Sequence, residues 1–228
     1  MAMDNQNEMP RKMPLIGDDA PAFAADTTVG RISFPDDYEG KWVILFSHPA
    51  DFTPVCSSEI ATFAAMTEEF KSMNTELLGV SVDSVSSHLA WLKSIQENIR
   101  YKAYDKQPIT FPIVADVKME VAKKYGMIQP YASDTKAVRA VFVIDPKHKI
   151  RAIIYYPLST GRNFDEIKRL LQALQTTDDY GVSTPADWRP GDKVMVSAPT
   201  TFEAMQNASA RQPAGVECED WFFCRRNL

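Results

Sequence analysis

Two patterns of apolar residues alternate along most of the chain. Continuous apolar runs predict strands that are buried on both faces of a sheet, and apolar residues recurring every three or four positions predict amphipathic helices. The expected strands cover 41–47, 77–82, 111–115, 140–144 and 150–156. The expected helices cover 54–74, 85–95, 119–125 and 164–174. A strand–helix–strand–helix order implies parallel strands joined by crossovers, whereas the short turn at 145–149 joins an antiparallel pair.

These elements predict an α/β protein with a mixed sheet flanked by helices, formed by residues 15–176. A hairpin with Gly30 as its turn residue should add accessory strands before the first long strand. Residues 1–14 lack periodicity and are expected to be a flexible leader. After Thr176 the chain is a polar segment that contains several prolines and few apolar clusters. Because such a segment cannot bury much core by itself, we expect residues 177–228 to form an arm that packs on another surface. A floppy tail is the alternative.

The strand at 41–47 runs through a polar turn into a helix whose first turn carries a cysteine. Thr53 can act as the N-cap and Pro54 suits the first helical position, which makes Cys56 the third helical residue. There, unpaired N–H groups and the positive end of the helix dipole favour the nucleophilic thiolate. We interpret Cys56 as redox-active, the alternative being an inert buried cysteine that serves as a small hydrophobe.

Composition narrows the possible functions. The 228 residues are 45% hydrophobic and 24% charged, which is typical of a globular protein. A net charge of −5 provides no basic field, so nucleic acid and anionic membranes are poor partner candidates. No stretch approaches the roughly 18 apolar residues of a membrane span, and the N-terminus lacks the apolar core of a signal peptide. We therefore expect a cytoplasmic protein, and the three cysteines fit catalytic thiols in a reducing compartment better than a disulfide scaffold.

The segment His48–Cys56, HPADFTPVC, resembles the active-site motif of the peroxiredoxins, in particular the 1-Cys subfamily and its archaeal-type relatives. The resemblance covers residues 15–224 and implies a thioredoxin-like fold with a C-terminal extension. It also implies that Cys56 attacks a peroxide oxygen, that the Thr53 hydroxyl hydrogen-bonds the peroxide, and that Pro49 shields the thiolate from water. A thioredoxin-type dithiol reductase would carry Cys-x-x-Cys here, but Thr53 occupies the place of its first cysteine.

The same resemblance implies a charged network around the thiolate. Arg139, within a matching strand, is expected to stabilise the thiolate and the leaving oxygen, because a guanidinium group stays charged and offers a fixed fork of donors. Glu59 is expected to orient the arginines, and Arg162 to join them. For Glu59 an exposed first-turn position is equally open. His48 is a supporting residue, either as a general base or as a histidine simply hydrogen-bonded at the strand end.

The implied activity is that of a thiol-specific peroxidase. It would reduce hydrogen peroxide and organic hydroperoxides through a sulfenic acid at Cys56, without metal, haem or flavin, using electrons from a thiol donor such as thioredoxin. A different class of function is an oligomeric holdase-like chaperone of the same fold with secondary peroxidase activity. A disulfide reductase is a third. We expect a homodimer that assembles into a decamer, as peroxiredoxins of this type often do.

Two cysteines in the arm depart from a strict 1-Cys pattern. Cys218 and Cys224 resemble the C-terminal cysteine pair of long peroxiredoxins, which implies a disulfide between Cys56 and Cys224 of the partner subunit, with Cys218 assisting. Alternatively, the two arm cysteines pack without reacting or pair with each other. They are too few for a zinc site. The two remaining histidines, His88 and His148, are expected to be exposed to solvent.

Overall fold

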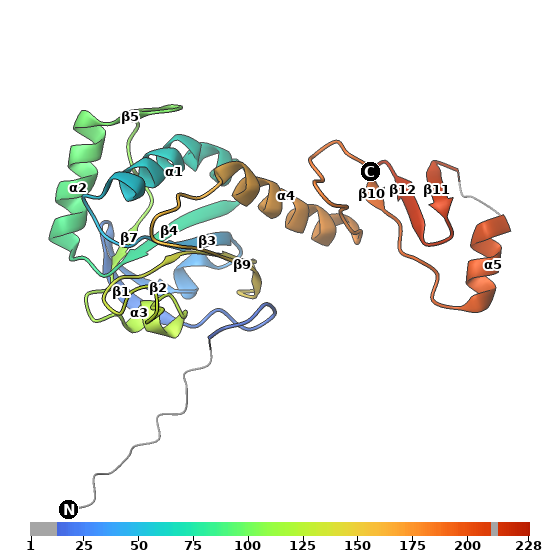
Figure 1. Cartoon of the computed structure of the whole chain (residues 1–228), viewed down its shortest axis with the longest axis horizontal. Coiled ribbons are helices and arrows are strands. Elements are labelled where there is room, and N and C mark those ends of the chain that lie inside the picture. Colours follow the sequence, from blue (N-terminus) through green and yellow to red (C-terminus); the bar gives the residue numbers. More distant parts are fainter. Residues whose placement is uncertain (1–12, 211–213) are drawn as a thin grey trace, which may run out of the picture. The chain divides into compact units, whose positions relative to one another are not determined.

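A computed structural model describes residues 13–210 and 214–228 of the chain (Figure 1). Backbone contacts divide the chain into two compact units, Met1–Arg162 and Asn163–Leu228. The expected leader lies outside the described residues except for its last two positions. The first unit contains the central sheet. The second unit begins with the helix expected at 164–174, which the sequence pattern assigns to the same domain as the sheet.

The first unit is built on a seven-stranded mixed sheet with the order β2-β1-β7-β4-β3-β8-β9. β3 (Trp42–Ser47) lies inside this sheet, parallel to β4 (Thr75–Ser81) and antiparallel to β8 (Arg139–Ile144). All six residues of β3 are buried, as its continuous apolar run predicts. The other strands are β1 (Phe23–Thr27), β2 (Gly30–Phe34), β7 (Ile113–Ala115) and β9 (Ile150–Tyr156). The predicted α/β class with a mixed sheet is therefore confirmed, including the antiparallel pairing of β8 with β9.

Helices connect the strands close to where the pattern predicts them. They are α1 (Pro54–Ser72), α2 (Val85–Asn98) and α3 (Glu120–Lys124), with a short 3-10 helix η1 (Asp36–Tyr38) and a small hairpin of β5 (Arg100–Tyr101) and β6 (Tyr104–Asp105). α1 ends two residues before the predicted Asn74, because Asn74 has a left-handed backbone with φ 52°. Met119, with φ 57°, likewise lies outside α3.

Both faces of the sheet are covered, because successive residues of β3 point in opposite directions. On one face the ring of Phe46 stacks on Phe63 of α1, with 4.2 Å between the ring centroids. On the other face Leu45 belongs to a buried cluster with Phe142 of β8, which meets Tyr125 just after α3 edge to face. α1 and α3 accordingly lie on opposite sides of the sheet in Figure 1. β3 is therefore packed on both faces.

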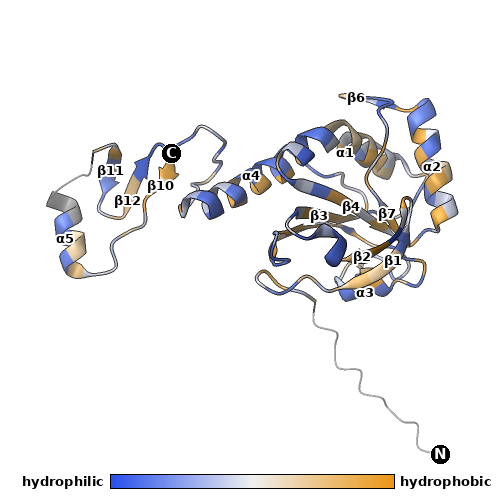
Figure 2. Cartoon of the chain, turned by 180° about the vertical axis from the view of Figure 1, so that it is seen from behind, coloured by the Kyte–Doolittle hydropathy of each residue, from blue (hydrophilic) through white to orange (hydrophobic). Residues whose placement is uncertain are grey.

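The second unit contains α4 (Phe164–Tyr180), along which hydrophobic and hydrophilic colours alternate in Figure 2. The Asn163 side chain accepts a hydrogen bond from Glu166 N, as predicted for the N-cap, and Gly181 ends the helix in a left-handed conformation. A buried cluster of Ala173, Trp188 and Val194 gives this unit a small core of its own.

The rest of the second unit consists of short elements. They are β10 (Val194–Met195), α5 (Phe202–Ala210), β11 (Val216–Asp220) and β12 (Phe223–Arg226), and the strands form a sheet in the order β10-β12-β11. None of the helices in the described part of the chain combines the length and apolarity needed to span a membrane.

Candidate active site

Cys56 lies where the sequence pattern places it, in the first turn of α1 beyond the end of β3. Its side chain is completely buried. Thr53 holds the N-cap position but does not cap the helix with its side chain, because its hydroxyl donates a hydrogen bond to the carbonyl of Ala50 at 2.9 Å. That detail of the prediction is wrong. Pro49 is buried in the preceding turn, and Phe52 takes a left-handed backbone with φ 54°.

Arg139 is the group in direct contact with the sulfur. It stands on β8, the antiparallel neighbour of β3, and its Nη1 lies 3.3 Å from Cys56 Sγ. Its Nε and Nη2 donate to the carbonyl oxygen of Leu158 at 3.1 and 2.7 Å. Since three of its nitrogens have partners, the guanidinium group is held in one orientation beside the thiol.

Glu59 joins the two arginines. One turn after Cys56 on the same side of α1, its Oε2 accepts from Arg139 Nη1 at 2.7 Å and lies 3.4 Å from Arg162 Nη1. Its Oε1 accepts from the backbone N–H of Arg162 at 2.9 Å. Glu59 is only 2% exposed. The alternative that it is an exposed residue in the first turn of the helix is therefore wrong.

Arg162 completes the network and links it to the end of β3. Its Nη2 donates to the carbonyl oxygen of Ser47, and burial lowers the pKa of its guanidinium to about 10 even though Glu59 opposes the shift. At neutral pH, two guanidinium groups and one carboxylate therefore leave the buried network with one positive charge. The Cys56 sulfur lies against this positively charged network.

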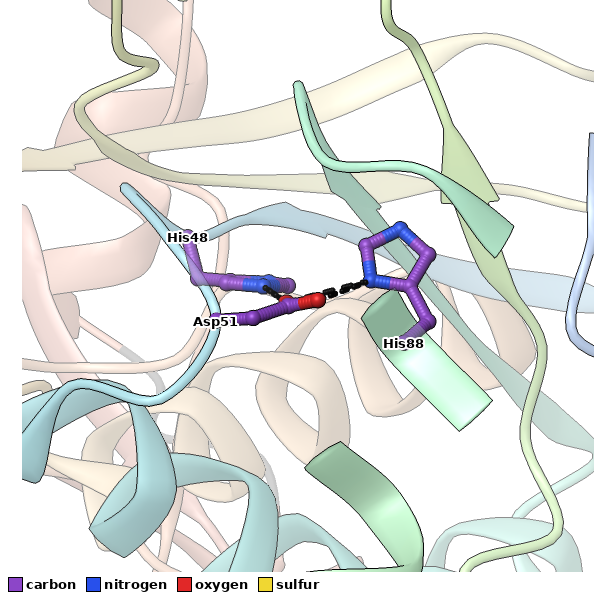
Figure 3. Close-up of side chains that lie close together, drawn as sticks. All are labelled: His48, Asp51 and His88. Carbon is purple, nitrogen blue, oxygen red and sulfur yellow. Dashed lines mark hydrogen bonds and ion pairs between the residues drawn. The ribbon is translucent and has the colours of Figure 1, made fainter. Parts of the chain in front are cut away.

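His48 is buried at the end of β3, where its Nε2 bonds Asp51 Oδ1 at 3.0 Å. Burial lowers the pKa of His48, and this effect outweighs the opposing interaction with Asp51. The prediction that His88 is exposed is wrong: it is fully buried because its ring also bonds Asp51 (Figure 3). The sequence analysis missed Asp51, although it lies inside the recognised motif, and no spacing rule connects it to His88 on α2.

The two arm cysteines lie in the second unit and are bonded to each other. Cys218 of β11 and Cys224 of β12 are paired across the two antiparallel strands and form a disulfide. Cys56 is the free cysteine of the chain. The structure thus contains the pairing that the sequence left open as an alternative to a bond with Cys56.

Comparisons with known proteins agree with this site. The AhpC/TSA family matches residues 16–153, and the C-terminal domain of 1-Cys peroxiredoxin matches residues 173–209. A peroxiredoxin of Methanosarcina mazei is 61% identical over 93% of this chain and 97% of its own length. A peroxiredoxin of Methanocaldococcus jannaschii is 48% identical over 95% of this chain and 100% of its own length.

Solved structures show the same similarity. A yeast mitochondrial 1-Cys peroxiredoxin, studied for thiol resolution via glutathione/thioredoxin systems, has a TM-score of 0.79 and 38% identity, covering 95% of this chain and all of that one. A cysteine-to-serine mutant of peroxiredoxin 6 of Arenicola marina has a TM-score of 0.80 and 34% identity, covering 93% of this chain and 97% of that one. These relatives confirm the thioredoxin-like fold and favour a peroxidase over a holdase. The chain therefore belongs to the AhpC/TSA family and is a peroxiredoxin, a thiol peroxidase with the C-terminal domain of the 1-Cys type.

Proposed function

We propose that Cys56 is the residue that reduces the peroxide, with Arg139, Glu59 and Arg162 holding it as a thiolate. The observation that carries this assignment is the 3.3 Å contact between Arg139 Nη1 and Cys56 Sγ, within a buried network that has one uncompensated positive charge. The thiolate attacks the terminal oxygen of hydrogen peroxide or an organic hydroperoxide. The O–O bond breaks, Cys56 becomes a sulfenic acid, and the leaving oxygen takes a proton to become water or an alcohol.

Arg139 and three further residues support this step. Arg139 stabilises the negative charge that moves from sulfur to the leaving oxygen. The Thr53 hydroxyl hydrogen-bonds the peroxide from the N-cap position of α1. Pro49, which is buried and has no N–H, shields the sulfur from water, and His48 supports the site from the end of β3.

The second half of the cycle uses the arm cysteines. Cys224 of the partner subunit condenses with the sulfenic acid of Cys56, releasing water and forming an inter-subunit disulfide. Cys218 then attacks the Cys224 sulfur, which releases Cys56 as a thiolate and leaves the Cys218–Cys224 disulfide. That disulfide is the pairing present in the structure, which supports the exchange step. An external thiol, such as thioredoxin, reduces it and closes the cycle.

Blocking the exchange should trap the intermediate. The protein is first reduced with dithiothreitol, freed of it, given one equivalent of hydrogen peroxide, and run unreduced on a denaturing gel. We expect Cys218→Ser to accumulate covalent dimers, because the Cys56–Cys224 bond forms but cannot be resolved. Cys224→Ser should remain monomeric on the gel. The opposite pattern would exchange the roles of the two cysteines, and absence of dimers in Cys218→Ser would contradict the inter-subunit mechanism.

Resolution by the partner subunit also requires an assembly. We propose a homodimer that associates into a decamer. Light scattering on the reduced protein should give a mass of at least twice the 25.6 kDa of one chain. A monomer at working concentration would contradict both the assembly and the resolving step.

A further inference from the structure

Asp51 lies between two buried imidazole rings. Its Oδ1 is 3.0 Å from His48 Nε2, and its Oδ2 is 2.9 Å from His88 Nδ1 (Figure 3). A third donor, the Ser87 hydroxyl, bonds Oδ2 at 2.7 Å. Each of the three side chains His48, Asp51 and His88 is at most 7% exposed. A ring nitrogen that faces an acceptor must carry a proton to bond it, so the neighbouring acceptors determine where the protons of this group lie.

His88 is flanked by acceptors on both sides. Its Nδ1 faces the carboxylate of Asp51, and its Nε2 lies 3.3 Å from the carbonyl oxygen of Val114. A carbonyl oxygen and a carboxylate can only accept hydrogen bonds, so both ring nitrogens of His88 must carry a proton to bond them. His88 is then an imidazolium whose charge is neutralised by Asp51.

His48, in contrast to His88, is a neutral imidazole with one protonated nitrogen. Burial alone would raise the pKa of Asp51, but the bonds from His48 and His88 outweigh it and hold that pKa below its ordinary value. Because Asp51 is ionised, Nε2 of His48 carries the proton of their hydrogen bond. Burial lowers the pKa of His48, so its ring is neutral and Nδ1 holds a lone pair. This Nδ1 has no hydrogen-bond partner among the described residues, which is uncommon for a buried polar atom.

The His48 ring, which carries this lone pair, directly follows the end of β3, where the peroxidase site lies. His48 follows Ser47, whose carbonyl accepts from Arg162, and the charge of Arg162 acts on the His48 ring. Arg162 Nε is likewise a buried donor with no partner in the described part of the chain. A hydroperoxide has one O–H to donate and oxygen lone pairs to accept, which are the kinds of partner that these two atoms lack.

We propose that Asp51 and His88 are positioning residues that hold His48 as the neutral Nε2–H tautomer, with its Nδ1 lone pair kept free to accept the O–H of the hydroperoxide. Asp51 sets the tautomer by accepting from Nε2. His88 supplies the positive charge that keeps Asp51 ionised in a buried site. The proposal rests on the peroxidase function proposed above and adds two residues that do not touch the substrate.

A metal ion is the competing explanation for this cluster. The three side chains offer ligand atoms within 4.8 Å of one another. However, zinc takes nitrogen and oxygen ligands at about 2.0–2.2 Å and requires unprotonated ring nitrogens. The direct ring-to-carboxylate distances of 2.9–3.1 Å instead match N–H···O hydrogen bonds.

The test is long-range 1H–15N NMR of the reduced, EDTA-treated full chain, which separates protonated from lone-pair ring nitrogens. The chain has three histidines, so single His→Gln variants assign the signals. We expect two protonated nitrogens on His88 and, on His48, a protonated Nε2 with a lone-pair Nδ1. A protonated Nδ1 on His48 would overturn the proposal. So would a shift of both rings on adding one equivalent of Zn²⁺, because the cluster would then be a metal site.

The rate of Cys56 oxidation by hydrogen peroxide provides a second measurement. In Asp51→Asn the amide cannot balance an imidazolium, so His88 should lose one ring proton and the rate should fall by about 10- to 100-fold. Asp83→Asn is the matched control, since Asp83 bonds Asp51 N and Ser81 but neither histidine in the described contacts. Equal rates in the two variants would overturn the proposal. If Cys56 of the wild type is not oxidised at all, the peroxidase assignment fails, while the NMR result still decides the tautomer.

Discussion

Cys56→Ser is expected to lose peroxidase turnover by on the order of 10⁴-fold or more. A serine hydroxyl is not ionised near neutral pH, so it presents no anion to the peroxide and gains little from the positive charge of the surrounding network. The measurement is consumption of hydrogen peroxide with dithiothreitol as the electron donor. Serine is similar to cysteine in size and slightly smaller, so it fits the buried position next to Arg139 without enlarging the site.

The matched control is the double variant Cys218→Ser with Cys224→Ser. It should keep dithiothreitol-supported turnover, because a small dithiol can reduce the Cys56 sulfenic acid directly without the arm cysteines. Activity of Cys56→Ser close to that of the wild type would place the peroxide chemistry on another residue. Loss of activity in the control alone would instead show that the arm cysteines take part even with dithiothreitol.

Glu59→Gln is expected to lower the free energy of unfolding by about 3–5 kcal/mol. The substitution keeps the shape of the side chain but removes the only carboxylate bonded to Arg139 and Arg162 in the described contacts. Two guanidinium groups would then face each other in a buried site with only the Cys56 thiolate to balance them. Urea denaturation of the reduced protein, followed by circular dichroism, measures the loss.

Glu68→Gln is the control on the same helix. Glu68 pairs with Lys71 at 3.0 Å, but its side chain is 85% exposed, so this substitution should change the stability by no more than about 1 kcal/mol. A loss in Glu59→Gln no larger than that of the control would mean that the two arginines are not held by Glu59. Their role in keeping Cys56 ionised would then need another explanation.

Local patterns determined much of the fold. The continuous run of β3, the N-cap position and proline at the start of α1, and the Asn163 cap of α4 were all predictable, because strand burial and helix ends depend on neighbouring residues. The motif around Cys56 was recognisable for the same reason, since it occupies one continuous segment. Boundaries shifted by a few residues where a left-handed residue such as Asn74 ended an element.

Other features were decided by the tertiary structure alone. The contact between Arg139 and Glu59 spans 80 positions and exists because β8 pairs with β3, which a periodicity cannot show. The resemblance to a known family supplied that residue, not the pattern. The exposure of His88 was wrongly predicted, because its burial also depends on a distant residue. Its polarity suggests solvent exposure, whereas Asp51, 37 positions earlier, offers a buried carboxylate. A buried polar side chain is stable only where distant groups satisfy it, so its burial is decided by the folded chain and not by the residues beside it.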